Sequence, residues 1–241
     1  SRVRVPFLSM KYSNRYNSKN LFKILGNLYM KVDYATDYNI TLKGLLHSKF
    51  HIGHLASRLH PKMKSYVLGT RNKHSIIDIK YTWERLQIAL RFIENIWKNS
   101  EQKILFVSIN SPGAKYLNKL SEVGQQPVLT KFWLPGSLTS KHKEEQGIRL
   151  NLPEFINKVE TQSSREGKIC AIFVIDSDAN FCRSLYKEAN ILGLPVISVL
   201  NTNSDPTLVS YPIPGNNRSI LVFSFLANVL LGILKRTRES R

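Results

Sequence analysis

Three apolar runs constrain the fold of this chain more than any other feature of its sequence. They are KILFVSI at 103–109, ICAIFVID at 169–176 and PVISVL at 195–200. Each is apolar almost without interruption, as a strand buried on both faces would be. Helical patterns follow the first two runs, at 111–124 and 181–192. Strands that alternate with helices predict right-handed crossovers and a parallel sheet with helices on both faces.

Further elements are predicted on either side of these runs. An apolar stripe that includes Leu86, Leu90 and Ile93 predicts a helix from Thr82 to Lys98. The other predictions are a short helix around 42–46, strands at 75–79, 127–133 and 211–214, and a final helix from Ser219 to about Arg236.

Positive charge is concentrated in the N-terminal third. The 241 residues carry a net charge of +18 at pH 7, which favours a polyanionic partner, first nucleic acid and second an anionic membrane surface. Residues 1–77 contain 14 Lys and Arg but only two acids, and no acid occurs between Asp37 and Asp78. The longest apolar stretch, 220–234, is short and interrupted by polar residues, so we expect no membrane span.

Cysteine usage and the first residues suggest a compartment. Cys170 and Cys182 are the only cysteines, which excludes a disulfide framework and fits a reducing environment. Both are expected to be ordinary buried or half-buried thiols. Residues 1–32 have seven Lys and Arg and no acid, typical of the N-terminus of an organelle protein. A basic arm without a targeting role, or an arbitrary start of the chain, is the alternative.

The segment FHIGHLASRLHPKMKSY at 50–66 contains two fragments of ATP-binding signatures. Residues 51–54 read HIGH and residues 62–65 nearly read KMSKS, the two signatures of class I aminoacyl-tRNA synthetases. In that fold much of a nucleotide-binding domain separates the two, whereas seven residues separate His54 from Lys62 here. One short segment cannot form both walls of an ATP site. We therefore interpret it as a basic, glycine-hinged loop that faces RNA.

The sequence also lacks the motifs of other nucleotide-binding and metal-dependent enzymes. The 12 glycines include no G-x-G pair and no G-K-[ST] motif, which excludes the dinucleotide fingerprint and the P-loop. Asp176, Asp178 and Asp205 follow strands and could hold Mg²⁺, but their neighbours favour capping and turn roles. The H-x₃-H-x₂-H pattern at 47–54 has no nearby Cys or acid to complete a zinc site. We expect no catalytic residue, no metal and no cofactor.

Several blocks, in order along the chain, resemble one family. They are LLHSKFHIGHLASRLHPKMKSYVLGTRNKHSIIDI at 45–79, KILFV at 103–107, FWLPGSLTS at 132–140, AIFVID at 171–176, EANILGLPVISVLNTNSDP at 188–206 and YPIPGNN at 211–217. Spread over residues 41–235, they resemble the small-subunit ribosomal protein two family, the universal uS-two protein of bacterial-type ribosomes.

The sequence departs from that family pattern in three places. Pro135 replaces the first of two paired glycines, and Ser140 stands in place of an Asn. The segment before AIFVID is shorter than the insertion of bacterial members, which forms a protruding helical hairpin. Residues 1–40 have no counterpart in the family core. A shortened hairpin and a basic extension are similar to mitochondrial members.

The resemblance implies a fold and a domain organisation. The expected fold is a three-layer, flavodoxin-like α/β domain, a parallel sheet flanked by helices. This domain would comprise 41–140 and 170–236, with a basic extension at 1–40, a shortened hairpin insertion at 141–169 and a basic tail at 237–241.

The resemblance also implies a structural component of the small ribosomal subunit. Such a protein binds small-subunit rRNA between head and body near the mRNA exit, beside neighbouring ribosomal proteins, without enzymatic activity, small-molecule substrate or membrane partner. Composition and the short insertion favour the mitochondrial matrix and organellar translation, with another bacterial-type ribosome as the fallback. The alternatives are a nucleotide-binding enzyme of synthetase type and a free nucleic-acid-binding protein.

Basic clusters are the candidate binding residues. The segment 43–74 contains no acid, so we expect its cations to neutralise phosphates. A second cluster brackets Trp133, which could stack on a base but is better explained as a core residue. Arg236, Arg238 and Arg241 form a third candidate contact. The predicted rRNA-binding residues are Lys43, Lys49, His51, His54, Arg58, Lys62, Lys64, Arg71, Asn72, Lys73, His74, Lys131, Lys141 and Lys143.

Overall fold

The computed structural model describes residues 40–98, 102–108, 111–130, 133, 135, 136, 138, 168–176 and 182–239. Every described residue belongs to one compact unit of the chain. Of the extension predicted at 1–40 and the insertion predicted at 141–169, residues 1–39 and 141–167 lie outside the described residues, as do Lys131, Lys141 and Lys143.

The predicted parallel sheet is present and has five strands. They are β4 (Gln102–Ser108), β5 (Val128–Leu129), β6 (Lys168–Asp176), β7 (Val196–Leu200) and β8 (Tyr211–Pro214), in the spatial order β5-β4-β6-β7-β8. All neighbouring pairs are parallel. Counted along the chain, this order is 2-1-3-4-5, which is the order of a flavodoxin-like sheet. The predicted fold class is therefore confirmed.

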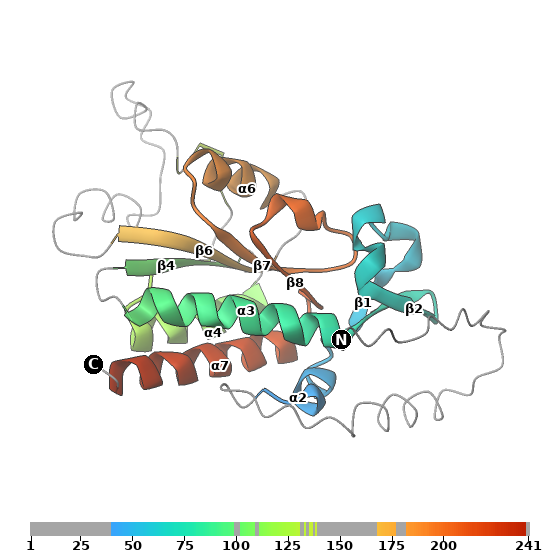
Figure 1. Ribbon diagram of the computed structural model, residues 1–241, viewed down its shortest axis with the longest axis horizontal. Coiled ribbons are helices and arrows are strands. Elements are labelled where there is room, and N and C mark those ends of the chain that lie inside the picture. The colour runs from blue at the N-terminus through green and yellow to red at the C-terminus, as the bar shows by residue number, and fades with distance from the viewer. Residues whose placement is uncertain are drawn as a thin grey trace, which may run out of the picture. The chain divides into compact units, whose positions relative to one another are not determined.

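Helices cover both faces of this sheet, as Figure 1 shows. On one face lie α3 (Ile79–Lys98), α4 (Ser111–Gly124) and α7 (Ile220–Glu239), and on the other lies α6 (Cys182–Ile191). Side chains alternate along β4 between two cores, one on each face of the sheet. Ile104 and Phe106 pack in the core beneath α3, α4 and α7, while Leu105 and Val107 pack in the core beneath α6. All four are buried, which explains why the strand is apolar from Ile104 to Val107.

Helix α7 combines length with apolar character. By length and composition alone it could cross a membrane, although 44% of its 18-residue apolar stretch is buried inside the protein. Val222, Phe223, Leu226 and Leu230 are buried in the core that α3 and α4 also form. The burial explains the apolar composition of α7 as that of a core helix.

A second, smaller sheet departs from the sequence-based prediction. The segment predicted to be a loop at 50–66 contains β1 (Ile52–Leu55) and the 3₁₀ helices η1 (Ala56–Arg58) and η2 (Pro61–Tyr66). With β2 (Val67–Arg71) and β3 (His74–Ile77), β1 forms an antiparallel sheet in the order β1-β3-β2. The loop prediction was wrong because these strands are short and irregular, with register shifts in both pairings. We call residues 43–74 the basic segment, which also includes most of α2 (Leu42–His47).

The ends of several predicted elements also differ. Asp78 lies just before α3 and its carboxylate accepts a hydrogen bond from Lys80 N–H at 2.9 Å, so the strand predicted at 75–79 ends earlier, at Ile77. Strand β5 comprises two residues instead of the predicted 127–133. Helix α7 continues to Glu239, so Arg236 and Arg238 lie in its last turn.

Candidate nucleic-acid interface

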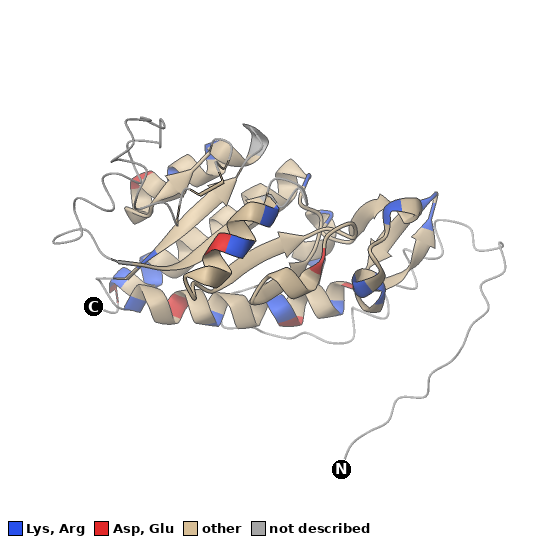
Figure 2. Ribbon diagram, turned by 90° about the horizontal axis from the view of Figure 1, so that it is seen from above, with Lys and Arg blue, Asp and Glu red and all other residues tan. Residues whose placement is uncertain are grey.

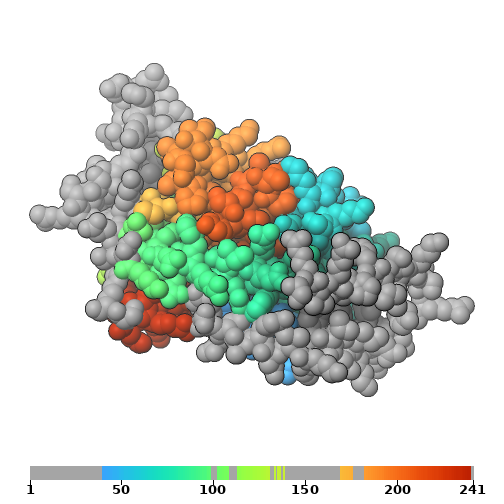
Figure 3. Space-filling view, in the orientation of Figure 1, coloured from blue at the N-terminus to red at the C-terminus, as the bar shows by residue number. Residues whose placement is uncertain are grey.

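The basic segment is attached to loops at the carboxyl ends of β7 and β8. Thr202, just after β7, accepts two backbone hydrogen bonds: His54 N–H binds its Oγ1 at 2.9 Å and His60 N–H binds its carbonyl oxygen at 2.8 Å. After β8, Asn216 N–H donates to the Phe50 carbonyl oxygen at 3.1 Å. Figure 3 shows the blue-green basic segment abutting orange atoms of the C-terminal half. These contacts hold the small sheet at the sheet edge where α/β proteins usually bind ligands.

Gly53, the glycine of the HIGH fragment, lies at a close contact with Thr202. A Cβ atom on this residue would lie 2.5 Å from Thr202 Cγ2 and 3.0 Å from the Ser75 carbonyl oxygen. No side chain fits there unless these neighbours move. The glycine therefore permits close packing of the small sheet on Thr202, and its role is structural.

The two histidines of the same fragment help to build this junction. The His51 carbonyl accepts Ile77 N–H at 2.8 Å, which extends the pairing of β1 with β3. Burial lowers the pKa of the half-buried His51 imidazole, and the positive charges of Arg71 and Lys49 lower it further. His54 is half-buried, and its ring nitrogens are enclosed without a hydrogen-bond partner among the described residues. Both are packed within the structure, unlike fully exposed phosphate ligands.

Lys62 has an acidic partner, which the sequence interpretation did not foresee. Its ammonium lies 2.9 Å from Asp205 Oδ2 and donates to Thr207 Oγ1 at 2.9 Å. Desolvation would raise the pKa of Asp205, but hydrogen bonds from Thr207 and the Lys62 charge lower it to about 2. The expectation that no acid opposes the basic segment is therefore wrong at this position. The predicted turn role of Asp205 is confirmed, because its Oδ1 accepts Thr207 N–H at 3.0 Å.

The β2–β3 hairpin gathers several predicted residues at one end of the small sheet. Arg71 and His74 are paired across a two-residue turn, Asn72–Lys73, in which both φ angles are positive, 48° and 66°. Positive φ at both positions is the mark of a type I′ turn. The Lys73 carbonyl accepts Ala56 N–H at 2.8 Å, so η1, which contains Arg58, is held against the turn. Arg58, Arg71, Lys73 and His74 are thus brought together.

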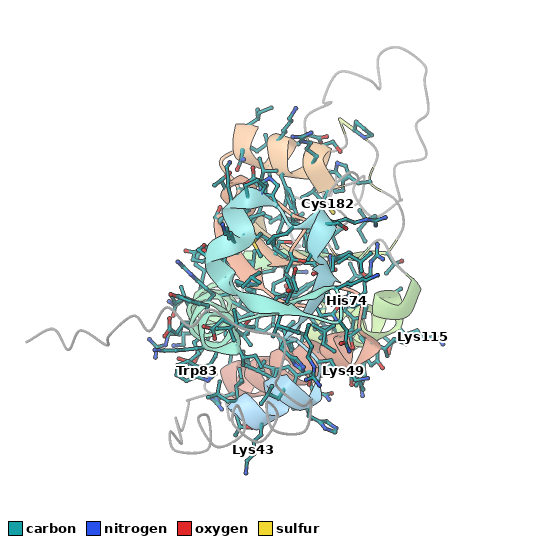
Figure 4. All side chains as sticks on the ribbon, turned by 90° about the vertical axis from the view of Figure 1, so that its right-hand side faces the viewer. Lys43, Lys49, His74, Trp83, Lys115 and Cys182 are labelled. Carbon is teal, nitrogen blue, oxygen red and sulfur yellow. The ribbon has the colours of Figure 1, made fainter. Side chains whose placement is uncertain are left out.

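The remaining predicted residues are more scattered. Lys43 is exposed on α2, Lys49 is exposed just after that helix, and Lys64 is exposed on η2. Figure 4 looks onto the small sheet and labels Lys43, Lys49 and His74. Figure 2 shows Lys and Arg along the small sheet. From residue 40 to residue 77 there are seven Lys and Arg and no acid.

Trp133 is a core residue, as predicted. It is 4% exposed, and its Nε1 lies 3.4 Å from Glu188 Oε1. The same carboxylate accepts Gly136 N–H at 2.7 Å and Leu138 N–H at 3.1 Å. Glu188 and Thr202 are the residues that sequence reasoning missed, because neither belongs to a charge cluster or a motif.

No metal site is formed within the part of the chain that the structure describes. There, no group of three or more His, Cys, Asp and Glu lies close enough to hold an ion. The histidines of the H-x₃-H-x₂-H pattern belong to different elements: His47 ends α2, and His54 lies in β1. The pattern therefore does not lie on one helix face.

Comparison with known proteins agrees with the fold and the blocks of sequence. The pattern that defines the family described as ribosomal protein S2 matches residues 45–169 and 140–236. The chain belongs to the ribosomal protein S2 family. It is 33% identical over 217 residues to the small ribosomal subunit protein uS2 of Hahella chejuensis, covering 79% of this chain and 85% of that protein. It is also 33% identical over 207 residues to the uS2 protein of Marinobacter nauticus, covering 75% and 82%.

The S2 family assignment includes the basic segment from residue 45 onward. The HIGH and KMKS fragments are therefore part of an S2-type sequence, so synthetase ancestry is not needed to explain them. The fold and the family predicted from the blocks are confirmed, while the individual rRNA-binding residues stay predictions.

Proposed function

We propose that this chain is a structural constituent of a small ribosomal subunit and binds small-subunit rRNA through the basic segment. One observation carries the assignment of the surface: between residues 40 and 77 the chain has seven cations and no acid, on and around the small antiparallel sheet. Lysine and arginine that neutralise phosphates release counterions, which favours binding to RNA. The relatives named small ribosomal subunit protein uS2 support the assembly to which it belongs.

The proposed place is the junction of head and body near the mRNA exit, in contact with neighbouring ribosomal proteins. This place follows from the S2 resemblance. We propose the mitochondrial matrix and organellar translation on the basis of the basic composition of residues 1–32 and the short insertion. The relatives above are bacterial, which supports a bacterial-type ribosome as the fallback.

The proposed role involves no catalysis. The small sheet occupies the carboxyl ends of β7 and β8, part of the edge where an α/β enzyme would bind its nucleotide. An enzyme of synthetase type predicts that ATP raises the melting temperature of the purified chain through ligand binding. We expect ATP at millimolar concentration to leave it unchanged.

Charge reversal tests the proposed surface. Replacing Lys64, Arg71 and Lys73 by Glu should abolish co-sedimentation of the full chain with small subunits in a high-salt sucrose gradient. Lys62 is left intact because it is paired with Asp205. The matched control reverses three other cations, the exposed Lys119, Arg183 and Lys187 of α4 and α6.

Circular dichroism should show that both triple variants keep the fold. If the two variants co-sediment equally well, the basic segment is not the main contact. If the unmodified chain never co-sediments with small subunits, the alternative of a free nucleic-acid-binding protein is favoured.

A further inference from the structure

The basic segment contains an unusual concentration of left-handed backbone. Among the described residues, four other than glycine have positive φ: Lys49, Asn72, Lys73 and Gln125. Asn adopts this conformation readily, whereas a long side chain such as Lys is disfavoured there relative to glycine. Two of the four are lysines, and both lie in the basic segment.

Lys49 occupies a helix-ending position at which glycine is the usual residue. Lys49 N–H binds the Leu46 carbonyl at 3.0 Å and Phe50 N–H binds the Leu45 carbonyl at 3.2 Å. With Ser48 as the C-cap of α2, these two bonds form a Schellman motif, and Lys49, with φ of 63°, is its left-handed residue. The motif requires positive φ at this position but gives no reason for a lysine.

Lys73 occupies the second such position. In the two-residue turn between Arg71 and His74, a type I′ geometry favours Asn followed by Gly. Asn72 fits that preference, and Lys73, with φ of 66°, stands where glycine is expected. The side chain of Lys73 is exposed and has no hydrogen bond to other described residues.

Strained backbone that persists at an exposed site points to a use for the side chain. We propose that Lys49 and Lys73 are retained at these two glycine-type positions because each places its ammonium on a phosphate of the bound RNA. The inference rests on the proposed function and specifies which cations make the contact. The two residues flank opposite ends of the β1–β3 pairing, so they would hold separate phosphates.

Glycine substitution separates this role from a structural one. Lys49→Gly and Lys73→Gly remove the charge and relieve the backbone, so the melting temperature of each variant should be at or above that of the wild type. Affinity for deproteinised small-subunit rRNA should fall, on the order of tenfold in the double variant. The slope of log K against log salt should become shallower by about one per lysine.

Two controls make the comparison specific. Gln125→Gly relieves a third positive φ, just after α4, and should leave rRNA affinity unchanged. Lys49→Arg and Lys73→Arg keep both the charge and the strained backbone, and should retain affinity and salt slope.

Filter binding of the full-length chain to rRNA measures both quantities between 50 and 200 mM salt. Over this range, affinity that rests on phosphate contacts falls steeply. Unchanged binding by the double glycine variant overturns this inference alone, as does a fall in its melting temperature. A double glycine variant that binds rRNA normally but does not enter small subunits also overturns the inference. The two lysines would then contact an acidic protein of the subunit instead of RNA. A wild-type chain that does not bind the rRNA overturns the proposed function as well.

Discussion

The two sheets of this protein are stabilised in different ways. The parallel sheet has apolar side chains on both faces and helices over each, so its strands are held between two buried cores. The antiparallel sheet has short strands and many exposed side chains, and it is held to the domain by hydrogen bonds at Thr202 and Asn216. One sheet supplies stability and the other presents charge. Mutations should therefore affect folding and RNA binding separately.

Removing a central side chain of the parallel sheet should have the largest effect. Phe106 is fully buried and its ring centroid lies 5.4 Å from that of Phe173 and 6.3 Å from that of Trp97. Phe106→Ala should lower the free energy of unfolding by about 3–5 kcal/mol, because it leaves a cavity in the core. Urea denaturation measures this difference.

A matched truncation in the small sheet sharpens the comparison. Leu68 on β2 is 53% exposed, so Leu68→Ala should change the free energy of unfolding by less than about 0.5 kcal/mol. A comparable loss in both variants would contradict the division of stability between the sheets.

The same contrast explains which part of the fold was predictable. A strand such as β4, buried on both faces, has an unbroken apolar run from Ile104 to Val107, so local sequence identifies it. Strands β1 and β2 have four and five residues, with register shifts where they pair with β3. Their pattern does not alternate strictly, and only pairing across the sheet reveals them.

The candidate site was predictable in charge but not in contacts. A stretch without acids can be read directly from the sequence. The acid that pairs with Lys62 lies 143 residues further along the chain, and the Thr202 hydroxyl that binds His54 N–H lies 148 residues away. Tertiary packing brings such residues together, and no local pattern records it.

A methyl group at Gly53 should separate the two sheets. In Gly53→Ala the new Cβ would meet Thr202 Cγ2 at 2.5 Å, so we expect a loss of about 1–3 kcal/mol from overpacking. Hydrogen exchange should show faster exchange of the β1 and β3 amides, while those of β4 and β6 stay protected. Gly69→Ala is the matched control, because nothing lies within 4 Å of a Cβ there.

Adding Thr202→Ser to Gly53→Ala tests the cause. Serine lacks the methyl carbon that the new Cβ would meet but keeps the hydroxyl that accepts His54 N–H. Protection of β1 and β3 should partly return in the double variant. If it does not, the decisive clash is not with the Thr202 methyl group.

The Lys62–Asp205 ion pair should contribute less to stability than the close packing at Gly53. The side chains are 52% and 24% exposed, so Asp205→Asn should change stability by about 0–1 kcal/mol at neutral pH. The pKa of Asp205 is lowered from 3.8 to about 2 on folding, so its contribution is present above pH 4 and disappears as pH falls through 2. The variant should therefore lose less stability than the wild type in acid, as denaturation between pH 5 and pH 2 would measure. Identical acid profiles would contradict the assignment.

His51 should show the smallest effect. Its pKa is sensitive both to burial and to the positive charges of the basic segment. Its pKa is lowered below 6.5 by burial and by the charges of Arg71 and Lys49, so the unfolded chain binds the proton more readily than the folded one. Stability should then rise with pH through this range: the full value holds above 6.5 and is lost as pH falls toward the lowered pKa. His51→Gln should flatten this dependence between pH 7.5 and pH 5. Phosphate bound beside Lys49 and Arg71 would offset their positive potential, so rRNA should weaken the dependence in the wild type. If RNA leaves the pH profile unchanged, the bound phosphates do not lie near His51.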